Sequence, residues 1–134
     1  MVYLLDTNAI SDLMRGRLAL EEWMGGLNAE DQVITCAIVR GEILFGIAKL
    51  QPGRRRRELE TAGEQFLETI RCHPVPERAG DFYAELKAKQ RRRGLALDEN
   101  DLWIAATSLA LDATLVSRDD DFGRIDGLRV VAVK

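Results

Sequence analysis

Short apolar runs alternate with longer stretches of mixed character along the chain. Five largely apolar runs predict β-strands, at residues 2–5, 32–36, 72–75, 113–117 and 128–133. Six further stretches predict helices, at residues 11–16, 18–27, 37–50, 54–71, 77–94 and 100–112. Strands that are apolar on both faces and alternate with helices are typical of a parallel sheet covered on both sides. The pattern therefore predicts an α/β fold around a mostly parallel sheet of four or five strands.

The predicted helix at residues 37–50 differs from the others because it is apolar nearly all round. Such a pattern is typical of a buried helix with no exposed face. Glu42 stands in its middle, and a buried carboxylate must find a partner or carry a large desolvation cost. Glu42 is therefore difficult to explain as an ordinary surface residue.

Acidic residues fall at the ends of several predicted elements. Asp6 follows the first strand directly, and Asp119 lies two residues after the run 113–117. Asp101 lies in the first turn of the helix that precedes that run, and Glu42 lies early in the helix that follows 32–36. In a parallel sheet these positions all lie near the carboxyl ends of the strands, where open α/β sheets bind ligands. We expect the four carboxylates to face one edge of the sheet.

Several of the acids, though not Glu42, also have an ordinary structural explanation. Asp6, Thr7 or Asn8 could cap the following helix, since small polar side chains are favoured at that position. Asp98 or Asn100 could cap the helix that contains Asp101 in the same way. The convergence of four acids from separate segments is more specific than any one of them.

Several carboxylates in one cleft repel one another and raise one another's pKa. A hard divalent cation relieves that repulsion, and Mg²⁺ prefers carboxylate, water and phosphate oxygens as ligands. A site of this kind suits metal-assisted hydrolysis of a phosphodiester bond, because the metal activates water and stabilises the developing charge. The amino-terminal dipole of its helix would help to keep Asp101 ionised.

The composition restricts the domain number and the overall charge, but it does not indicate a second kind of active site. The chain has 134 residues, which favours one domain, and a formal net charge of −3, so it has no overall basic field for nucleic acid. Two local basic runs, residues 54–57 and 91–93, are either solvated helix surface or contacts for RNA phosphates.

The sequence also bears on the compartment. Cys36 and Cys72 are far apart and lack metal-ligand spacing, which favours a reduced, cytosolic protein over a disulfide framework. No basic segment precedes the first apolar run, so we expect no signal peptide. No apolar run approaches the length of about 18 residues that spans a membrane.

Four segments together resemble one known family. They are LLDTN at residues 4–8, RGEILFG at 40–46, ALDENDLWIAATSLALDATLVSRDDDF at 96–122 and IDGLRV at 125–130. Their order and spacing resemble PIN-domain proteins of the VapC type, the ribonuclease toxins of type II toxin–antitoxin pairs. The resemblance implies a single PIN domain over residues 1–134, folded as a three-layer α/β/α sandwich. It further implies a Mg²⁺- or Mn²⁺-dependent endoribonuclease acting on RNA, a cognate VapB-like antitoxin, and a homodimer or higher assembly.

The same resemblance implies roles for individual residues. Asp6 and Asp101 would be the core metal ligands, and Glu42 would complete the acidic site. Asp119 would be the fourth acid, with Asp121 as the alternative in the same run of three aspartates.

Four further residues would support these acids. Thr7, Asn8 and Ser117 match small polar positions that orient the carboxylates by hydrogen bonds. Asp98 would join the same edge if the helix containing Asp101 begins early.

Two other functional classes are compatible with acids at a parallel sheet edge. One is a phosphatase or phospho-relay domain, but a dehalogenase-type enzyme needs a second Asp where Asn8 stands. A receiver domain needs a phosphoacceptor Asp after a central strand and a Lys after a late one, where Ala37 and Arg118 stand. The other class is a binding module with a decayed nuclease site, which the presence of all four acids does not favour.

Overall fold

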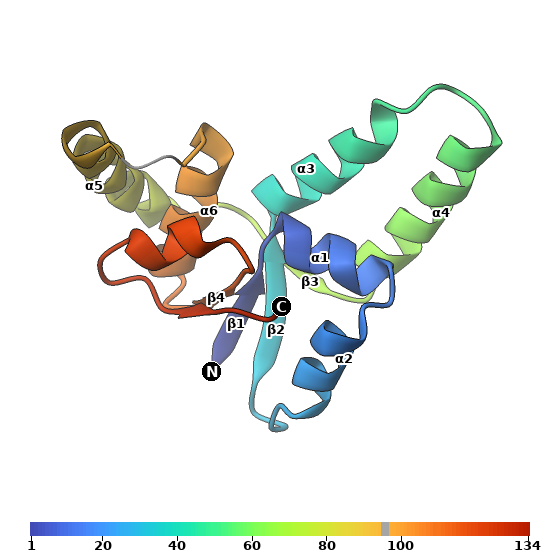
Figure 1. The fold of residues 1–134 in the computed structure, drawn as a ribbon, viewed down its shortest axis with the longest axis horizontal. Coiled ribbons are helices and arrows are strands. Elements are labelled where there is room, and N and C mark those ends of the chain that lie inside the picture. Colours follow the sequence, from blue (N-terminus) through green and yellow to red (C-terminus); the bar gives the residue numbers. More distant parts are fainter. Residues whose placement is uncertain (95–96) are drawn as a thin grey trace.

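A computed structural model describes residues 1–94 and 97–134 of the chain (Figure 1). Ala96, which opens the long segment of the family resemblance, lies outside the described residues. The strands are β1 (Val2–Leu5), β2 (Gln32–Cys36), β3 (Arg71–His73), β4 (Thr114–Val116) and β5 (Val130–Val131). The helices are α1 (Thr7–Met14), α2 (Leu18–Gly25), α3 (Ala37–Ala48), α4 (Arg54–Glu68), α5 (Arg78–Arg93) and α6 (Glu99–Ala110), with a short 3-10 helix, η1, at Asp120–Arg124.

The five strands form one parallel sheet in the order β3-β2-β1-β4-β5. The chain builds outward from β1 to β3, then returns past β1 to place β4 on its other side. With right-handed crossovers, this reversal puts α1 to α4 on one face of the sheet and α5 and α6 on the other. Figure 1 shows these two groups of helices on opposite sides of the strands. The prediction of a three-layer α/β/α fold with a parallel sheet is confirmed.

Local chemistry explains where the observed elements depart from the predicted ranges. The helix predicted at residues 11–16 begins earlier, at Thr7, because Asp6 caps it. The strand predicted at 72–75 is Arg71–His73, and Pro74, which cannot donate a ladder hydrogen bond, follows its last residue. The 3-10 helix at Asp120–Arg124 was not predicted, because one short turn leaves no apolar periodicity in the sequence.

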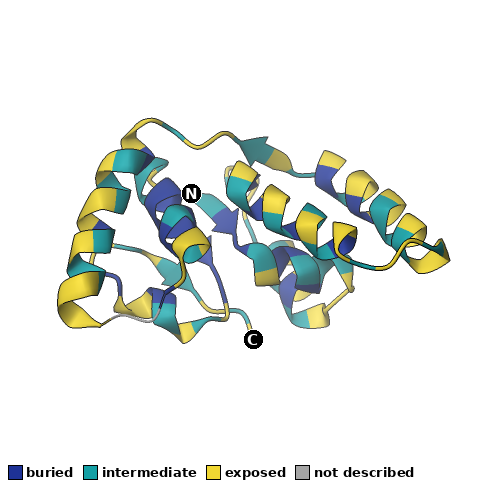
Figure 2. Ribbon diagram, turned by 90° about the horizontal axis from the view of Figure 1, so that it is seen from above, coloured by how far each residue is buried: buried dark blue, intermediate teal, exposed yellow. Residues whose placement is uncertain are grey.

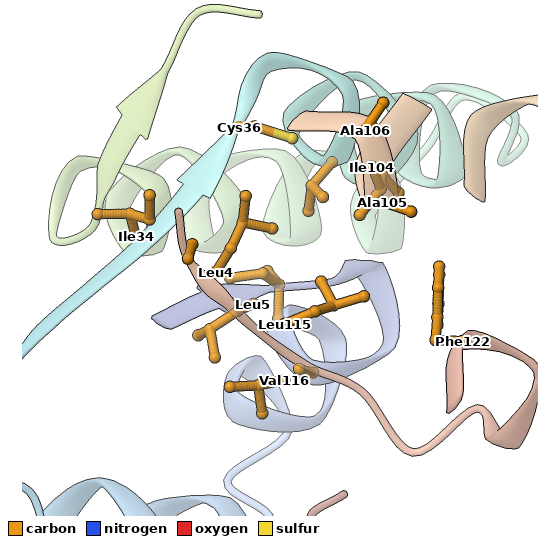
Figure 3. Packing of buried hydrophobic residues seen from close by; sticks show 14 of the residues in the cluster. Leu4, Leu5, Ile34, Cys36, Ile104, Ala105, Ala106, Leu115, Val116 and Phe122 are labelled. Atoms are coloured by element: carbon orange, nitrogen blue, oxygen red, sulfur yellow. The ribbon is translucent and has the colours of Figure 1, made fainter. Parts of the chain in front are cut away.

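The core lies between the central strands and the inner faces of the helices. Leu4, Leu5, Leu115 and Val116 from β1 and β4 are fully buried (Figure 3). Because side chains alternate along a strand, the paired Leu4 and Leu115 face one layer of helices, and the paired Leu5 and Val116 face the other. Figure 2 shows buried residues on the inward faces of the helices and exposed residues on their outer turns. The sheet between these layers is the rigid support from which the acidic residues project.

Helix α3 is not buried all round, so that prediction is wrong. Only Val39, Ile43 and Ile47 are buried, along one stripe, while the Phe45 side chain is 67% exposed. The reason is that α3 and its partner α4 extend beyond the sheet, as Figure 1 shows, so no layer formed by the described residues covers the outer face of α3. Among the described residues, no helix is both long and apolar enough to cross a membrane.

The reversal of strand order places the carboxyl ends of β1 and β4 side by side. Strand β1 pairs with β4 up to Leu5 and Val116, and the Asp6 amide then donates to the Val116 carbonyl at 3.2 Å. Ligands of open α/β sheets bind where the strand order reverses in this way. The chain segments that leave β1 and β4 therefore start at the most favourable point for a site.

We expect truncation of the central core to destabilise the whole fold. Leu115 is fully buried in β4, so Leu115→Ala should lower the free energy of unfolding by about 2–5 kcal/mol through lost burial and a residual cavity. Leu18→Ala is the control, because Leu18 is 65% exposed, and its effect should stay within about 0.5 kcal/mol. Chemical denaturation measures both, and equal effects would contradict this description of the core.

Candidate active site

Asp6 is the first residue after β1 and the N-cap of α1. Its side chain is buried, and its Oδ1 accepts a hydrogen bond from the Ala9 amide at 2.8 Å. The cap explains why a carboxylate is tolerated there, because it satisfies a helix amide that would otherwise lack a partner. The sequence expectation that Asp6 caps a helix is confirmed.

Burial raises the pKa of Asp6 above the usual carboxyl value. Hydrogen bonds from the Ser117 hydroxyl and the Ala9 amide oppose that rise, because they stabilise the ionised form. The charge of Asp119 raises the pKa further, whereas the guanidinium of Arg118 lowers it. After burial, residues of the segment that follows β4 therefore also influence the pKa of Asp6.

Ser117 and Asp119 form a compact turn at the end of β4. The Asp119 amide donates to the Ser117 hydroxyl at 3.0 Å, and Asp119 Oδ1 accepts from the Asp121 amide at 2.9 Å. Asp119 thereby caps η1, as Asp6 caps α1. Asp121 lies one position inside η1 and forms an ion pair of 4.0 Å with Arg124. These two aspartates are thus in different surroundings.

Asp101 lies in the first turn of α6, half-buried, beside the Asp98 N-cap. Asp98 Oδ1 accepts from the Asp101 amide at 2.8 Å. Burial raises the pKa of Asp101 to about 7, and the charges of Asp98, Glu42 and Asp119 contribute to that rise. Asp98 therefore caps the helix and also adds negative charge at this edge, which are the two roles that the sequence suggested for it.

Glu42 on α3 reaches the same edge and has a specific partner. Its Oε1 accepts a hydrogen bond of 2.6 Å from the Thr7 hydroxyl at the start of α1. The bond joins residues 35 positions apart in the chain and so fixes α3 to α1 beside Asp6. Asn8, in contrast, is exposed and makes no side-chain hydrogen bond to the carboxylates of the described residues.

Glu42 and Thr7 also stand at one end of a cleft between α1, α3 and α4. Its other walls combine apolar residues such as Ile43 with basic residues such as Arg15 and Lys49. The acidic edge is therefore continuous with an open groove of mixed apolar and basic character.

The acids influence one another without forming a closed metal cage. Within residues 1–94 and 97–134, no three His, Cys, Asp or Glu side chains stand in an arrangement that could already hold a metal ion. The charges of Glu42 and Asp119 nevertheless both raise the pKa of Asp101, which places them near it. A set of carboxylate oxygens that repel one another suits a hard divalent cation such as Mg²⁺ or Mn²⁺.

Arg118 also acts at this edge, although its sequence pattern predicts no role for it. Its charge acts on Asp6 only because the fold brings the ends of β1 and β4 together. An arginine within a charged loop has no sequence signal that separates it from a solvated one. The order of the strands shows what the sequence does not, namely that Arg118 lies near Asp6.

Comparison with known proteins identifies relatives over almost the whole chain. The family model of the PIN domain matches residues 3–128. Toxin FitB of Neisseria gonorrhoeae is 31% identical, covering 87% of this chain and 86% of its own length. Ribonuclease VapC1 of Haemophilus influenzae strain R2866 is 30% identical, covering 96% of each chain. The solved structure of VapBC-1 from nontypeable Haemophilus influenzae superposes with a TM-score of 0.87 at 28% identity, covering 98% of each chain.

We expect Mn²⁺ binding to strengthen as the pH rises from 6 to 8. The raised pKa of Asp101, about 7, means that a proton competes with the cation below neutrality and is released on binding. Displacement of one such proton should strengthen the binding about tenfold over this range, with little further gain above it. Calorimetric titration with Mn²⁺ at several pH values measures the effect.

Asp101→Asn is the control for that titration, because the amide cannot release a proton. This variant should bind Mn²⁺ more weakly and lose most of the pH dependence between 6 and 8. Equal affinity at all pH values in the unmodified protein would exclude Asp101 as a ligand with a raised pKa.

Proposed function

Because the chain belongs to the PIN-domain family, we propose that it is a Mg²⁺- or Mn²⁺-dependent endoribonuclease built as a single PIN domain over residues 1–134. We further propose that it is the toxin component of a type II toxin–antitoxin pair. The observation that carries the proposal is the accumulation of acids from separate segments, whose charges add to the effect of burial in raising the pKa of Asp101 to about 7. Stability alone gives no reason to collect repelling charges at one edge.

In this proposal the carboxylates of Asp6 and Asp101 hold the cation, and Glu42 and Asp119 complete the site. A bound divalent cation would supply a Lewis acid that activates water and stabilises charge on the phosphate. The protein contributes rigid placement. The helix caps fix Asp6 and Asp119, and the Thr7 hydroxyl fixes Glu42.

The surroundings of the two candidate aspartates favour Asp119 as the fourth acid. The charge of Asp119 acts on both Asp6 and Asp101. Asp121 instead donates its amide to Asp119 and faces Arg124. Asp121 therefore supports the turn that carries Asp119, and we assign it no metal contact.

The proposed partner is a VapB-like antitoxin that inhibits the nuclease. Relatives named as a toxin and as a VapC ribonuclease support this assignment. The cleft between α1, α3 and α4 leads to Glu42 and Thr7, so an antitoxin segment seated there would block the acids. The exposed Phe45 lies on the neighbouring uncovered face of α3. A homodimer or higher assembly is part of the same proposal.

The remaining parts of the proposal concern the substrate and the compartment. Arg54 and Arg56 form ion pairs with Glu58 and Glu60 on their own helix, which leaves less free positive charge there for RNA phosphates. We place the protein in the cytoplasm, where its RNA substrate is found. The two free thiols of Cys36 and Cys72 fit a reducing compartment.

The direct test is metal-dependent cleavage of RNA by the purified protein. Cleavage should require Mg²⁺ or Mn²⁺ and should stop when EDTA removes the metal. Asp6→Asn and Asp101→Asn should each reduce the rate by at least about a hundredfold, because each removes a proposed metal ligand. A mass-spectrometric map of the RNA ends locates the cuts.

Asp126→Asn is the matched control for these variants. Asp126 is an exposed aspartate that pairs with Arg93 at 3.0 Å, and its replacement should leave cleavage unchanged. Cleavage that survives both active-site substitutions, or that continues in EDTA, would reject the assignment.

A second comparison separates the two aspartates after β4. Asp119→Asn should lower the cleavage rate strongly and weaken Mn²⁺ binding, because it removes a charge that acts on Asp6 and Asp101. Asp121→Asn should retain most of the activity, since its backbone amide can still bond Asp119. The reverse order of effects, measured under identical conditions, would assign the fourth position to Asp121.

A further inference from the structure

Asp12 is a buried acid that the proposed active site does not contain. It lies on α1, six residues after Asp6, and is only 2% exposed. Its Oδ1 is buried and has no hydrogen-bond partner among the described residues. A carboxylate in this situation requires a specific explanation, because burial of an incompletely paired charge is costly.

Three physical costs oppose an aspartate at this position. Burial removes its hydration, aspartate is a weak helix former, and the last turn of a helix disfavours negative charge. Asp12 lies in the last turn of α1, beside core residues such as Ala9 and Leu20 that line the same small pocket. An apolar side chain at this position would stabilise the fold more than a buried carboxylate does. The folding of α1 alone therefore does not explain the charge.

Two arginines from different segments compensate the buried charge. Arg17, in the link between α1 and α2, places Nη1 at 3.6 Å from Asp12 Oδ1. Arg118, in the segment after β4, places Nε at 3.3 Å from Asp12 Oδ2. The second ion pair joins α1 to a segment more than 100 residues away in the chain.

Arg118 stands between two residues of the proposed site. Ser117 before it lowers the pKa of Asp6 and accepts from the Asp119 amide, and Asp119 follows it. Asp12, Ser117 and Arg118 also line one small pocket. The Arg118 backbone is part of the turn that carries Asp119, so an ion pair that anchors the Arg118 side chain also restrains this turn relative to Asp6.

We infer that Asp12 is a positioning residue that, through its ion pair with Arg118, holds Ser117 and Asp119 in place against Asp6. Asp6 caps the short helix on which Asp12 lies, so one acid of the site is fixed at the start of α1 while α1 also anchors the segment that supplies another. This inference rests on the proposed function for its effect on catalysis. Its effect on metal binding can be measured independently of catalysis.

The test combines Mn²⁺ calorimetry with RNA cleavage kinetics of Asp12→Asn. This variant keeps the shape of the side chain and removes its charge. We expect about 10- to 100-fold weaker Mn²⁺ binding and a kcat lowered by a similar factor, the loss typical of residues that hold metal ligands in place. KM for RNA and the midpoint of thermal unfolding should change little, and Asp12→Glu should restore part of the activity.

Two arginine variants show which partner carries the effect. In an Arg118→Met background, Asp12→Asn should add little to the loss, because both substitutions remove the same contact. Arg17→Met is the matched control, since it removes the other partner of the same carboxylate, and it should keep Mn²⁺ affinity and kcat close to those of the unmodified protein.

Several results would overturn the inference. The first is an Asp12→Asn variant with the Mn²⁺ affinity and kcat of the unmodified protein, and the second is a loss explained entirely by unfolded protein. The third is that Asp12→Asn and Arg118→Met act independently. The fourth is an effect confined to KM, which would make Arg118 a phosphate contact. If the unmodified protein does not cleave RNA, the proposed function fails, while the Mn²⁺ affinities of the variants still test the placement of Asp119.

Discussion

Repulsion among carboxylates at the carboxyl edge of the sheet is the constraint on which the rest of this structure depends. The fold holds Asp6 in a buried cap and Asp101 in a half-buried first turn, with the charges of Glu42 and Asp119 close enough to raise the pKa of Asp101. Burial reduces the screening of these charges by solvent and therefore increases the repulsion between them. The protein stabilises it through amides, hydroxyls and arginines, and a divalent cation would supply the remaining positive charge.

The parallel sheet explains why these acids meet. The order β3-β2-β1-β4-β5 reverses beside β1, so the chain leaves β1 and β4 at neighbouring points on one edge. Each acid of the proposed site either lies at the start of a helix or lies on a helix that is hydrogen-bonded to the start of another helix. Asp6 and Asp119 cap α1 and η1, Asp101 follows the cap of α6, and α3 is joined to α1 by the bond between Thr7 and Glu42. The orientation of the acids therefore comes from the ordinary backbone chemistry of helix ends.

Much of this arrangement could be predicted from the sequence, because strand ends and helix starts leave local signals. Asp6 after an apolar strand and Asp101 after a cap residue are examples. The burial of α3 was predicted wrongly, because apolar periodicity does not indicate whether another layer covers a helix, and Phe45 is left exposed. The pair of Asp12 and Arg118 could not be predicted, since it depends on the order of the strands, which sequence analysis did not address.

The most direct test of a metal-centred site is anomalous diffraction from crystals of the unmodified protein grown with Mn²⁺. The structure leads us to expect an anomalous peak between the carboxylates of Asp6 and Asp101, within reach of Asp119 or Glu42. Oxygen ligands would surround the ion at distances of about 2.0–2.3 Å, as expected for a hard divalent cation. A Mn²⁺ ion bound at another place, or no ion at this edge in a protein that still cleaves RNA, would contradict the proposed site.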